Sequence, residues 1–250
     1  GLAIMGDLKA TAIRTWVDFT YGSKPEASEF DNMRAYRQAG KKIVAVLHNN
    51  SVPANETVAR DTANRLADAS AGAIDGYEII NEPNLSGYFT GSLSEYVNKI
   101  LRPFSSVLGA RGLKVYGGAI SVEIPDVQQL DHLGYFDLVD VATFHPYQNN
   151  GVDAIKRTQE FIKVVNKRKP IALTEWGIHG SWNTPKLNDE QWAAQFQIIL
   201  DGIAPDVDEL YYYRMIQNTQ PAGHEGLLVP NSFEPTAFYQ PFKNLKGPWK

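Results

Sequence analysis

The feature that most constrains the fold is a regular alternation of short apolar runs with segments of helical pattern. The runs are rich in Val, Ile and Tyr, and several are apolar nearly throughout: they span residues 10–19, 42–48, 76–80, 113–120, 138–145, 170–176 and 209–216. Strands buried on both faces of a parallel sheet have this composition, whereas half-exposed strands alternate apolar and polar residues. Amphipathic helices are expected at about 29–40, 55–71, 92–109, 152–168, 188–203 and 235–245.

No linker rich in Pro, Ser or Gly divides these repeating units. Strand–helix alternation of this length without a linker predicts an α/β fold in which residues 1–250 form a single small (β/α)8 TIM barrel. Such a barrel has eight strands, and the shortage lies at the front. Either residues 2–5 are an abbreviated first strand, or residues 2–10 form a helix and the first strand is shortened or missing. The spacing of Met5, Leu8 and Ile13 favours the helix, with the first well-formed strand at 11–18.

Composition excludes several classes of function. The net charge of −4 is spread along the chain without a basic tract, which argues against a nucleic-acid partner. No apolar run reaches the ~20 residues of a membrane helix. The chain has no cysteine, and its five histidines lack close ligand spacing, so we expect neither metal nor cofactor. It begins at Gly1 without a Met or a signal peptide, as expected for a mature or trimmed form, and we expect a monomer.

Polar and aromatic side chains stand at the carboxyl ends of the expected strands. In a parallel barrel these ends share one mouth, where catalysis takes place. Several separate strands contribute to this rim: the residues are Arg14, Trp16, His48, Asn81, Glu82, His145, Tyr147, Glu175, Trp176 and Tyr213. The convergence predicts a functional site at this mouth.

Each of these residues also has an ordinary structural interpretation. Glu82 could cap a helix start, since a proline follows it, and Glu175 could be a loop carboxylate or an ion-pair partner. His145 alone would more often be a buried histidine, and Trp16 a core aromatic. Arg14 is harder to dismiss, because a buried guanidinium is rarely left without a carboxylate partner. Two carboxylates on opposite sides of one mouth suit cleavage of a glycosidic bond.

Four short motifs, taken in order, resemble the clan A glycoside hydrolases, a group of retaining (β/α)8 enzymes. They are Arg14 on what would be the second barrel strand, "INEPN" (80–84), "HPY" (145–147) and "TEWG" (174–177). The nearest look-alikes are family 39-like and family 5-like members, including bacterial exopolysaccharide hydrolases that degrade biofilms. "VYGGAIS" (115–121), residues 135–147 and residues 225–245 are similar to that group's fifth strand, sixth strand and final closure.

The resemblance implies a role for each matching position. Glu82 would be the general acid/base and Glu175 the nucleophile, with ~5–5.5 Å between their carboxyl groups as in retaining enzymes. Asn81 would bind the sugar 2-hydroxyl. Arg14 and Tyr147 would contact Glu175, and His145 would lie near Glu82. The remaining supporting or substrate-binding positions would be Trp16, His48, Trp176 and Tyr213, the last standing where the group usually has a Trp.

The function expected from this resemblance is a retaining β-glycosidase acting on a polysaccharide or oligosaccharide through a covalent glycosyl-enzyme intermediate. Two alternatives stay open: a transglycosylase, and a non-hydrolytic carbohydrate-binding barrel. Intact Glu82 and Glu175 argue against the second, because loss of either acid is the simplest way to inactivate such an enzyme. From the substrate class we expect a secreted, periplasmic or cell-surface protein.

Overall fold

The computed structural model describes residues 2–148, 150–177, 189–213, 227–228, 232, 234–236 and 239–244. The strands are β1 (Ala12–Asp18), β2 (Lys42–His48), β3 (Gly76–Glu78), β4 (Lys114–Tyr116), β5 (Ile120–Ser121), β6 (Ala142–His145), β7 (Ile171–Trp176) and β8 (Glu209–Tyr212). The longer helices are α2 (Asp31–Gln38), α3 (Glu56–Ala69), α5 (Arg102–Ala110), α6 (Ile124–His132), α8 (Gly151–Val165) and α9 (Asp189–Ile203). Shorter helical segments are α1 (Leu2–Asp7), η1 (Ala27–Phe30), α4 (Leu93–Glu95), the π-helix η2 (Tyr96–Leu101), α7 (Tyr135–Leu138), η3 (Ala204–Asp206) and α10 (Tyr239–Lys243).

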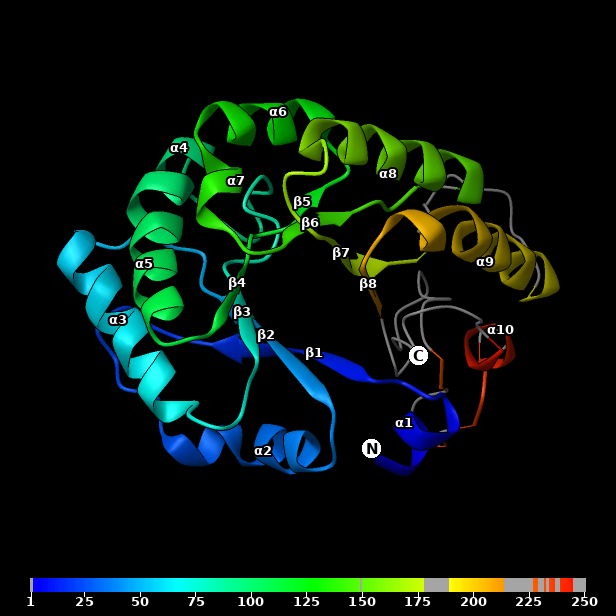
Figure 1. Cartoon of the computed structure of the whole chain (residues 1–250), viewed down its shortest axis with the longest axis horizontal. Coiled ribbons are helices and arrows are strands. Elements are labelled where there is room, and N and C mark those ends of the chain that lie inside the picture. Colours follow the sequence, from blue (N-terminus) through cyan, green and yellow to red (C-terminus); the bar gives the residue numbers. More distant parts are fainter. Residues whose placement is uncertain are drawn as a thin grey trace.

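The strands form two parallel four-stranded sheets with a simple order. One sheet has the order β1-β2-β3-β4 and the other β5-β6-β7-β8, so each strand pairs with its neighbour in sequence. A parallel bridge between Tyr116 and Val141 links the two sheets. Figure 1 shows the strands at the centre of an arc of helices that runs from α2 to α9. The α/β class and the parallel pairing predicted from the sequence are therefore confirmed.

The interior enclosed by the strands is filled by side chains from both sheets. Val44 and Tyr116 on one sheet pack with Ala172 and Tyr211 on the other, together with Val141. Lys42 on β2 also forms an ion pair with Glu209 on β8, whose carboxylate accepts hydrogen bonds from the Tyr116 and Tyr211 hydroxyls. A packed centre of this kind is typical of barrel folds rather than of open sheets. Between β1 and β8, the outer strands, the described residues show no ladder pairing.

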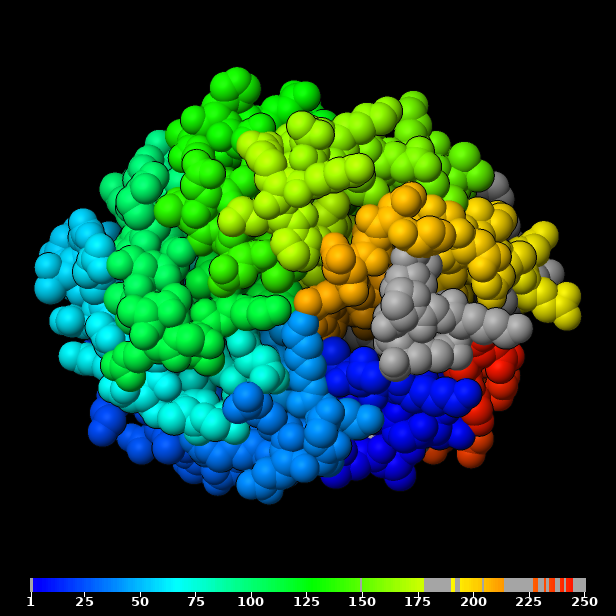
Figure 2. Space-filling view, viewed as in Figure 1, coloured from blue at the N-terminus to red at the C-terminus, as the bar shows by residue number. Residues whose placement is uncertain are grey.

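The front of the chain is helical, as the apolar spacing predicts. Residues 2–7 form α1, and β1 at residues 12–18 is the first strand. Met5 and Leu8 are buried, which explains the spacing that favours a helix here. Asp7 holds α1 against α10 through hydrogen bonds from Tyr239 and Lys243, so helices from the two ends of the chain lie side by side (Figure 2).

The apolar run at 113–120 differs from its prediction, because it forms two short strands instead of one. The break falls at Gly117 and Gly118, between β4 and β5. A Cβ at Gly117 would lie 1.7 Å from the Tyr135 hydroxyl, and one at Gly118 would lie 2.6 Å from the Ile80 carbonyl oxygen. Neighbouring groups therefore approach this backbone too closely for any side chain, and they interrupt the ladder.

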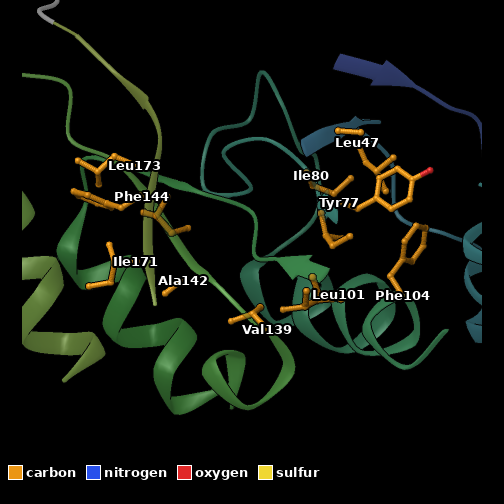
Figure 3. Packing of buried hydrophobic residues seen from close by; sticks show 14 of the residues in the cluster. Leu47, Tyr77, Ile80, Leu101, Phe104, Val139, Ala142, Phe144, Ile171 and Leu173 are labelled. Carbon is orange, nitrogen blue, oxygen red and sulfur yellow. The ribbon is translucent and has the colours of Figure 1, made fainter. Parts of the chain in front are cut away.

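The main hydrophobic core lies between the sheets and the surrounding helices. Figure 3 shows Tyr77 of β3 beside Leu101 and Phe104, and Phe144 of β6 beside Ile171 and Leu173. The helices predicted between residues 29 and 203 are present over the residues that the structure describes, whereas the one predicted at 235–245 is helical over Tyr239–Lys243 and Pro235 instead forms an antiparallel bridge with Leu228. Helices α6 and α7 were not predicted, and α7 occupies residues 135–138, which the sequence resemblance assigns to the sixth strand. Within the described ranges no helix is both long and apolar enough to cross a membrane.

Candidate active site

Arg14 on β1 is the centre of a buried network of charges. Its Nε and Nη2 donate to the two carboxylate oxygens of Glu78 at 2.7 and 2.9 Å. Its Nη1 donates to Glu175 Oε1 at 2.6 Å, and Nη2 also donates to Asn81 Oδ1 at 2.7 Å. The Arg14 side chain is 6% exposed, and the charges of its two carboxylate partners outweigh burial and raise its pKa. The prediction that Arg14 needs a carboxylate partner is confirmed, and it has two.

Glu175 on β7 is held in its charged form. Burial opposes ionisation, but the charges of His145 and Arg14, with hydrogen bonds from Arg14 and Tyr147, keep the pKa of Glu175 below its ordinary value. The two oxygens are held separately, since Oε1 accepts from Arg14 and Oε2 accepts from the Tyr147 hydroxyl at 3.0 Å. The contacts of Arg14 and Tyr147 with Glu175, expected from the resemblance, are confirmed.

Glu82 has a different partner. Its Oε1 lies 2.9 Å from His145 Nδ1, and His145 Nε2 lies 3.1 Å from the Thr174 hydroxyl. The imidazole is fully buried and Glu82 is 6% exposed. Such a contact can hold a proton between carboxyl and ring, because either group can be the donor. The expected proximity of His145 and Glu82 is confirmed. Through its other ring nitrogen, His145 also links Glu82 to Thr174, the β7 residue that precedes Glu175.

The chain bends sharply where it leaves β3 to place Glu82. Ile80 and Glu82 have positive φ values of 66° and 42°. Asn84 fastens the following loop, because its Nδ2 donates to the Ser121 carbonyl and to Asp126 while its Oδ1 accepts from the Ser121 amide. The "NEPN" segment is therefore a fixed turn tied to β5 and α6.

An aromatic group lines the rim next to the carboxylates. Trp16 on β1 is 38% exposed, stacks against Tyr88 with 6.3 Å between ring centroids, and meets the His48 ring edge-on at 5.1 Å. His48 Nδ1 lies 2.7 Å from Asp18 Oδ1. Burial, followed by the charges of Glu82 and Glu175, raises the pKa of Tyr88 to about 12. Tyr88 therefore lies within the electrostatic reach of both carboxylates.

Tyr213 and Trp176 occupy different environments. Tyr213 follows β8 and meets Tyr147 edge-on, with ring centroids 6.4 Å apart, so it lies beside the Glu175 partner. Trp176 is fully buried, and its ring packs toward α9 against Phe196 and Tyr212. The structure does not bring Trp176 into the polar cluster, because the pairing of β7 with β8 is irregular between Leu173 and Trp176 and the indole packs toward α9.

Sequence reasoning missed two members of the cluster. Glu78, fully buried on β3, accepts both hydrogen bonds of the Arg14 fork, and Thr174 supports His145. The signal for Glu78 was present, since "GYEII" places a carboxylate inside an apolar run and such a charge requires a cation. Other polar or aromatic candidates near strand ends lie outside the described residues: they are His179, Trp182, Arg214 and Gln217.

The described residues contain no group of three or more His, Cys, Asp or Glu side chains that could hold a metal ion. The chemistry available to the cluster is that of its acids and bases: one carboxylate held as an anion, and a second in hydrogen-bond contact with an imidazole. This combination is suited to acid–base and nucleophilic catalysis.

Comparison with known proteins finds likeness in structure only. No protein-family model matches the chain, and no curated protein matches it. Solved structures do match along nearly all of it, and glycoside hydrolases are among them. At these identities the likeness shows the fold alone, so this chain has the fold of the glycoside hydrolases that it matches.

Three of these structures show the range of the likeness. A glucosidase from Croceicoccus marinus has a TM-score of 0.76 and 15% identity over 97% of this chain. A family 39 glycoside hydrolase enzyme from Xanthomonas axonopodis pv. citri has a TM-score of 0.74 and 16% identity over 97% of this chain. The chain spans 62% and 61% of their lengths. A family 128 endo-β-1,3-glucanase from Amycolatopsis mediterranei, in complex with laminaripentaose, has a TM-score of 0.66 and 19% identity, covering 98% of this chain and 94% of that one.

Proposed function

We propose that this chain is a retaining β-glycosidase that hydrolyses a polysaccharide or oligosaccharide through a covalent glycosyl-enzyme intermediate. The observation that carries the proposal is the contrast between the two carboxylates of one buried cluster. Glu175 is held as an anion by Arg14 and Tyr147, whereas Glu82 lies in hydrogen-bond contact with the buried imidazole of His145. A nucleophile must be charged and a general acid must carry a proton, so the environments fit these two roles.

In the first step, a Glu175 carboxylate oxygen attacks the anomeric carbon while the bond to the leaving oxygen breaks. Glu82 donates its proton to that oxygen, and the sugar becomes an ester of Glu175. Ester formation removes the negative charge of Glu175, so the hydrogen bonds from Arg14 and Tyr147 weaken. Glu82 has by then given up its proton to the leaving group, so it can act as a base in the next step.

In the second step, Glu82 accepts a proton from water as the water oxygen attacks the anomeric carbon. Glu175 leaves as a carboxylate, and the two inversions give net retention. Asn81 supports both steps. Because its Oδ1 accepts from Arg14, its amide nitrogen is the group that we assign to the sugar 2-hydroxyl.

The substrate proposal rests on the rim. Trp16 offers an exposed aromatic face beside His48 and Tyr88, which suits stacking on a sugar ring. Tyr213 would fill the place of the Trp that usually forms the floor under the cleaved sugar. We further propose that the two sheets are the halves of one (β/α)8 barrel in which β4 and β5 are a single interrupted strand, and the described residues hold no barrel strand before β1. A polymeric glycan is met outside the cytoplasm, so we propose a secreted, periplasmic or cell-surface location.

The test is a screen of bacterial exopolysaccharides and plant glycans, including β-1,3-glucan, for released reducing ends. For any substrate that is cleaved, NMR of the initial product reports its anomeric configuration, and retention is expected. A fluorinated sugar inactivator should label the peptide that contains Glu175. Glu175→Gln, which keeps the shape and loses the charge, is the matched inactive control. An inverted product would exclude the covalent mechanism, and repeating the assay with an acceptor sugar distinguishes transglycosylation.

A further inference from the structure

The turn that carries Glu82 has a backbone conformation that L-residues rarely adopt. Ile80 has a φ of 66° although it is β-branched, and Glu82 has a φ of 42°. The Ile80 side chain is 1% exposed and lies in the core near Tyr77 (Figure 3). A conformation of this kind persists only where the surrounding structure holds it. The contacts around the turn should therefore include a group that does so.

That group is the hydroxyl of Tyr96. It donates to the Ile79 carbonyl oxygen at 2.9 Å and accepts from the Gly118 amide at 2.7 Å. Tyr96 is fully buried and is the first residue of the π-helix η2, a local geometry that is often found at functional sites. One side-chain atom thus joins the residue before the strained turn to the glycine between β4 and β5.

Gly118, whose amide donates to the Tyr96 hydroxyl, also packs directly against the backbone of the turn. A Cβ at this position would lie 2.6 Å from the Ile80 carbonyl, 2.7 Å from the Ile79 carbonyl and 2.8 Å from the Tyr96 hydroxyl. The backbone of the turn therefore rests directly on Gly118. Because the hydroxyl bridges both segments, removing it leaves a buried amide and a buried carbonyl without this partner.

We propose that Tyr96 is a positioning residue for the general acid. Its hydroxyl, clamped between Gly118 N–H and Ile79 C=O, holds the left-handed turn that aims Glu82. This inference rests on the proposed function, in which Glu82 donates a proton to the leaving group. Glu175 accepts its hydrogen bonds from Arg14 and Tyr147, which lie outside the turn, although Arg14 also donates to Asn81 within it. Loss of the Tyr96 hydroxyl therefore impairs proton donation by Glu82 more than nucleophilic attack by Glu175.

The experiment compares leaving groups in Tyr96→Phe, with kcat/KM as the readout because it reports the step that forms the glycosyl-enzyme. On a dinitrophenyl glycoside, whose leaving group needs no proton, the variant should lose only the small part of kcat/KM that a displaced Asn81 accounts for. On a phenyl or alkyl glycoside it should fall on the order of 10²-fold, as expected for a misplaced catalytic group. Equal losses on both substrates, or no loss on either, would overturn the proposal.

Tyr77→Phe is the matched control. Tyr77, on β3, is fully buried like Tyr96, but its hydroxyl donates to the Leu66 carbonyl and to the Ser70 hydroxyl, away from the turn. The ratio of this variant's kcat/KM to that of the parent should be the same for both leaving groups. Gly118→Ala perturbs the same contact independently and should give the same selective loss, whereas Gly109→Ala, whose added Cβ meets nothing within 4 Å, should not. Gly118→Ala decides the question if Tyr96→Phe does not fold.

The proposed function and this inference fail in different ways. A parent protein that cleaves no glycoside contradicts the function itself. A parent that cleaves both substrates, with a Glu82→Ala variant that is selective for good leaving groups and a Tyr96→Phe variant that is not, contradicts only the role of Tyr96.

Discussion

Arg14 Nη1 donates to Glu175 Oε1 at 2.6 Å, and this contact joins β1 to β7 across the interior of the molecule. The same guanidinium forms a two-point contact with Glu78 on β3. One cation therefore compensates two buried carboxylates from different strands. The arrangement keeps the Glu175 carboxylate charged although it is buried. It also makes the pKa of Glu175 depend on Arg14.

Replacing Arg14 with Gln should move the acidic limb of the kcat/KM profile to higher pH. The pKa of Glu175 is held low in the folded protein, so Glu175 stays ionised until the pH falls through that lowered value. Without the cation the pKa rises and protonation begins at a higher pH. Measuring kcat/KM against pH for both proteins tests this prediction.

The same variant should lose stability, because removing one partner of a buried ion pair leaves an uncompensated charge, at about 3–5 kcal/mol. Arg168→Gln is the matched control, since Arg168 forms a two-point contact with Asp131 at the surface. The acidic limb of the kcat/KM profile of Arg168→Gln should stay where it is in the parent. If the acidic limb of Arg14→Gln is not shifted, Arg14 does not set the pKa of Glu175.

Glu175→Ala should abolish turnover and regain part of it when azide or formate is added. A small anion can enter the vacated side and attack the anomeric carbon, so the product should have inverted configuration. Product analysis by NMR checks this. Rescue with retained configuration would mean that another group is the nucleophile.

The sequence predicts most of this cluster because most of its members stand at or near strand ends. Parallel strands bring their carboxyl ends to one edge, so His145 and Glu175 converge without any knowledge of loops. Arg14 is the third residue of β1 and reaches Glu175 through its long side chain. Glu78 was not predicted as a member of the cluster, because its pairing with Arg14 depends on the register of the strands. Trp176 was included because it adjoins Glu175 in sequence, although its ring packs against Phe196 and Tyr212.

The fold was predictable to a similar depth. Buried parallel strands carry a strong apolar signal, and the runs at 42–48 and 170–176 correspond closely to β2 and β7. The split at Gly117 and Gly118 depends on the approach of Tyr135 and Ile80 from elsewhere in the chain, which no local pattern contains. The positive φ of Ile80 is equally hidden, because isoleucine favours an ordinary strand.

Replacing Trp16 with Ala should weaken binding of long substrates more than short ones. Its exposed face would contact a sugar beyond the reacting one, so KM for an oligosaccharide should rise about 2- to 10-fold, the equivalent of about 0.5–1.5 kcal/mol. An aryl monoglycoside should be almost unaffected. Ile198→Ala on α9 removes a similarly exposed apolar side chain, at 39% against 38%, and should change neither value. A uniform effect across chain lengths would argue against a stacking role.

Glu82→Ala should separate the two chemical steps. An activated aryl glycoside needs no proton donor, so the variant should still form the covalent intermediate and release a burst of aryl alcohol. Removal of the intermediate should then be slow, because no base activates water, and the steady state should fall by about 10²–10⁴-fold. Stopped-flow absorbance resolves the burst from the steady state, and Glu160→Ala on α8, which removes a carboxylate paired only with Arg157 in the described structure, is the control. If Glu82→Ala hydrolyses a natural glycan at the parent rate, the contact between Glu82 and His145 has no part in proton transfer, and the assignment of the acid/base must be abandoned.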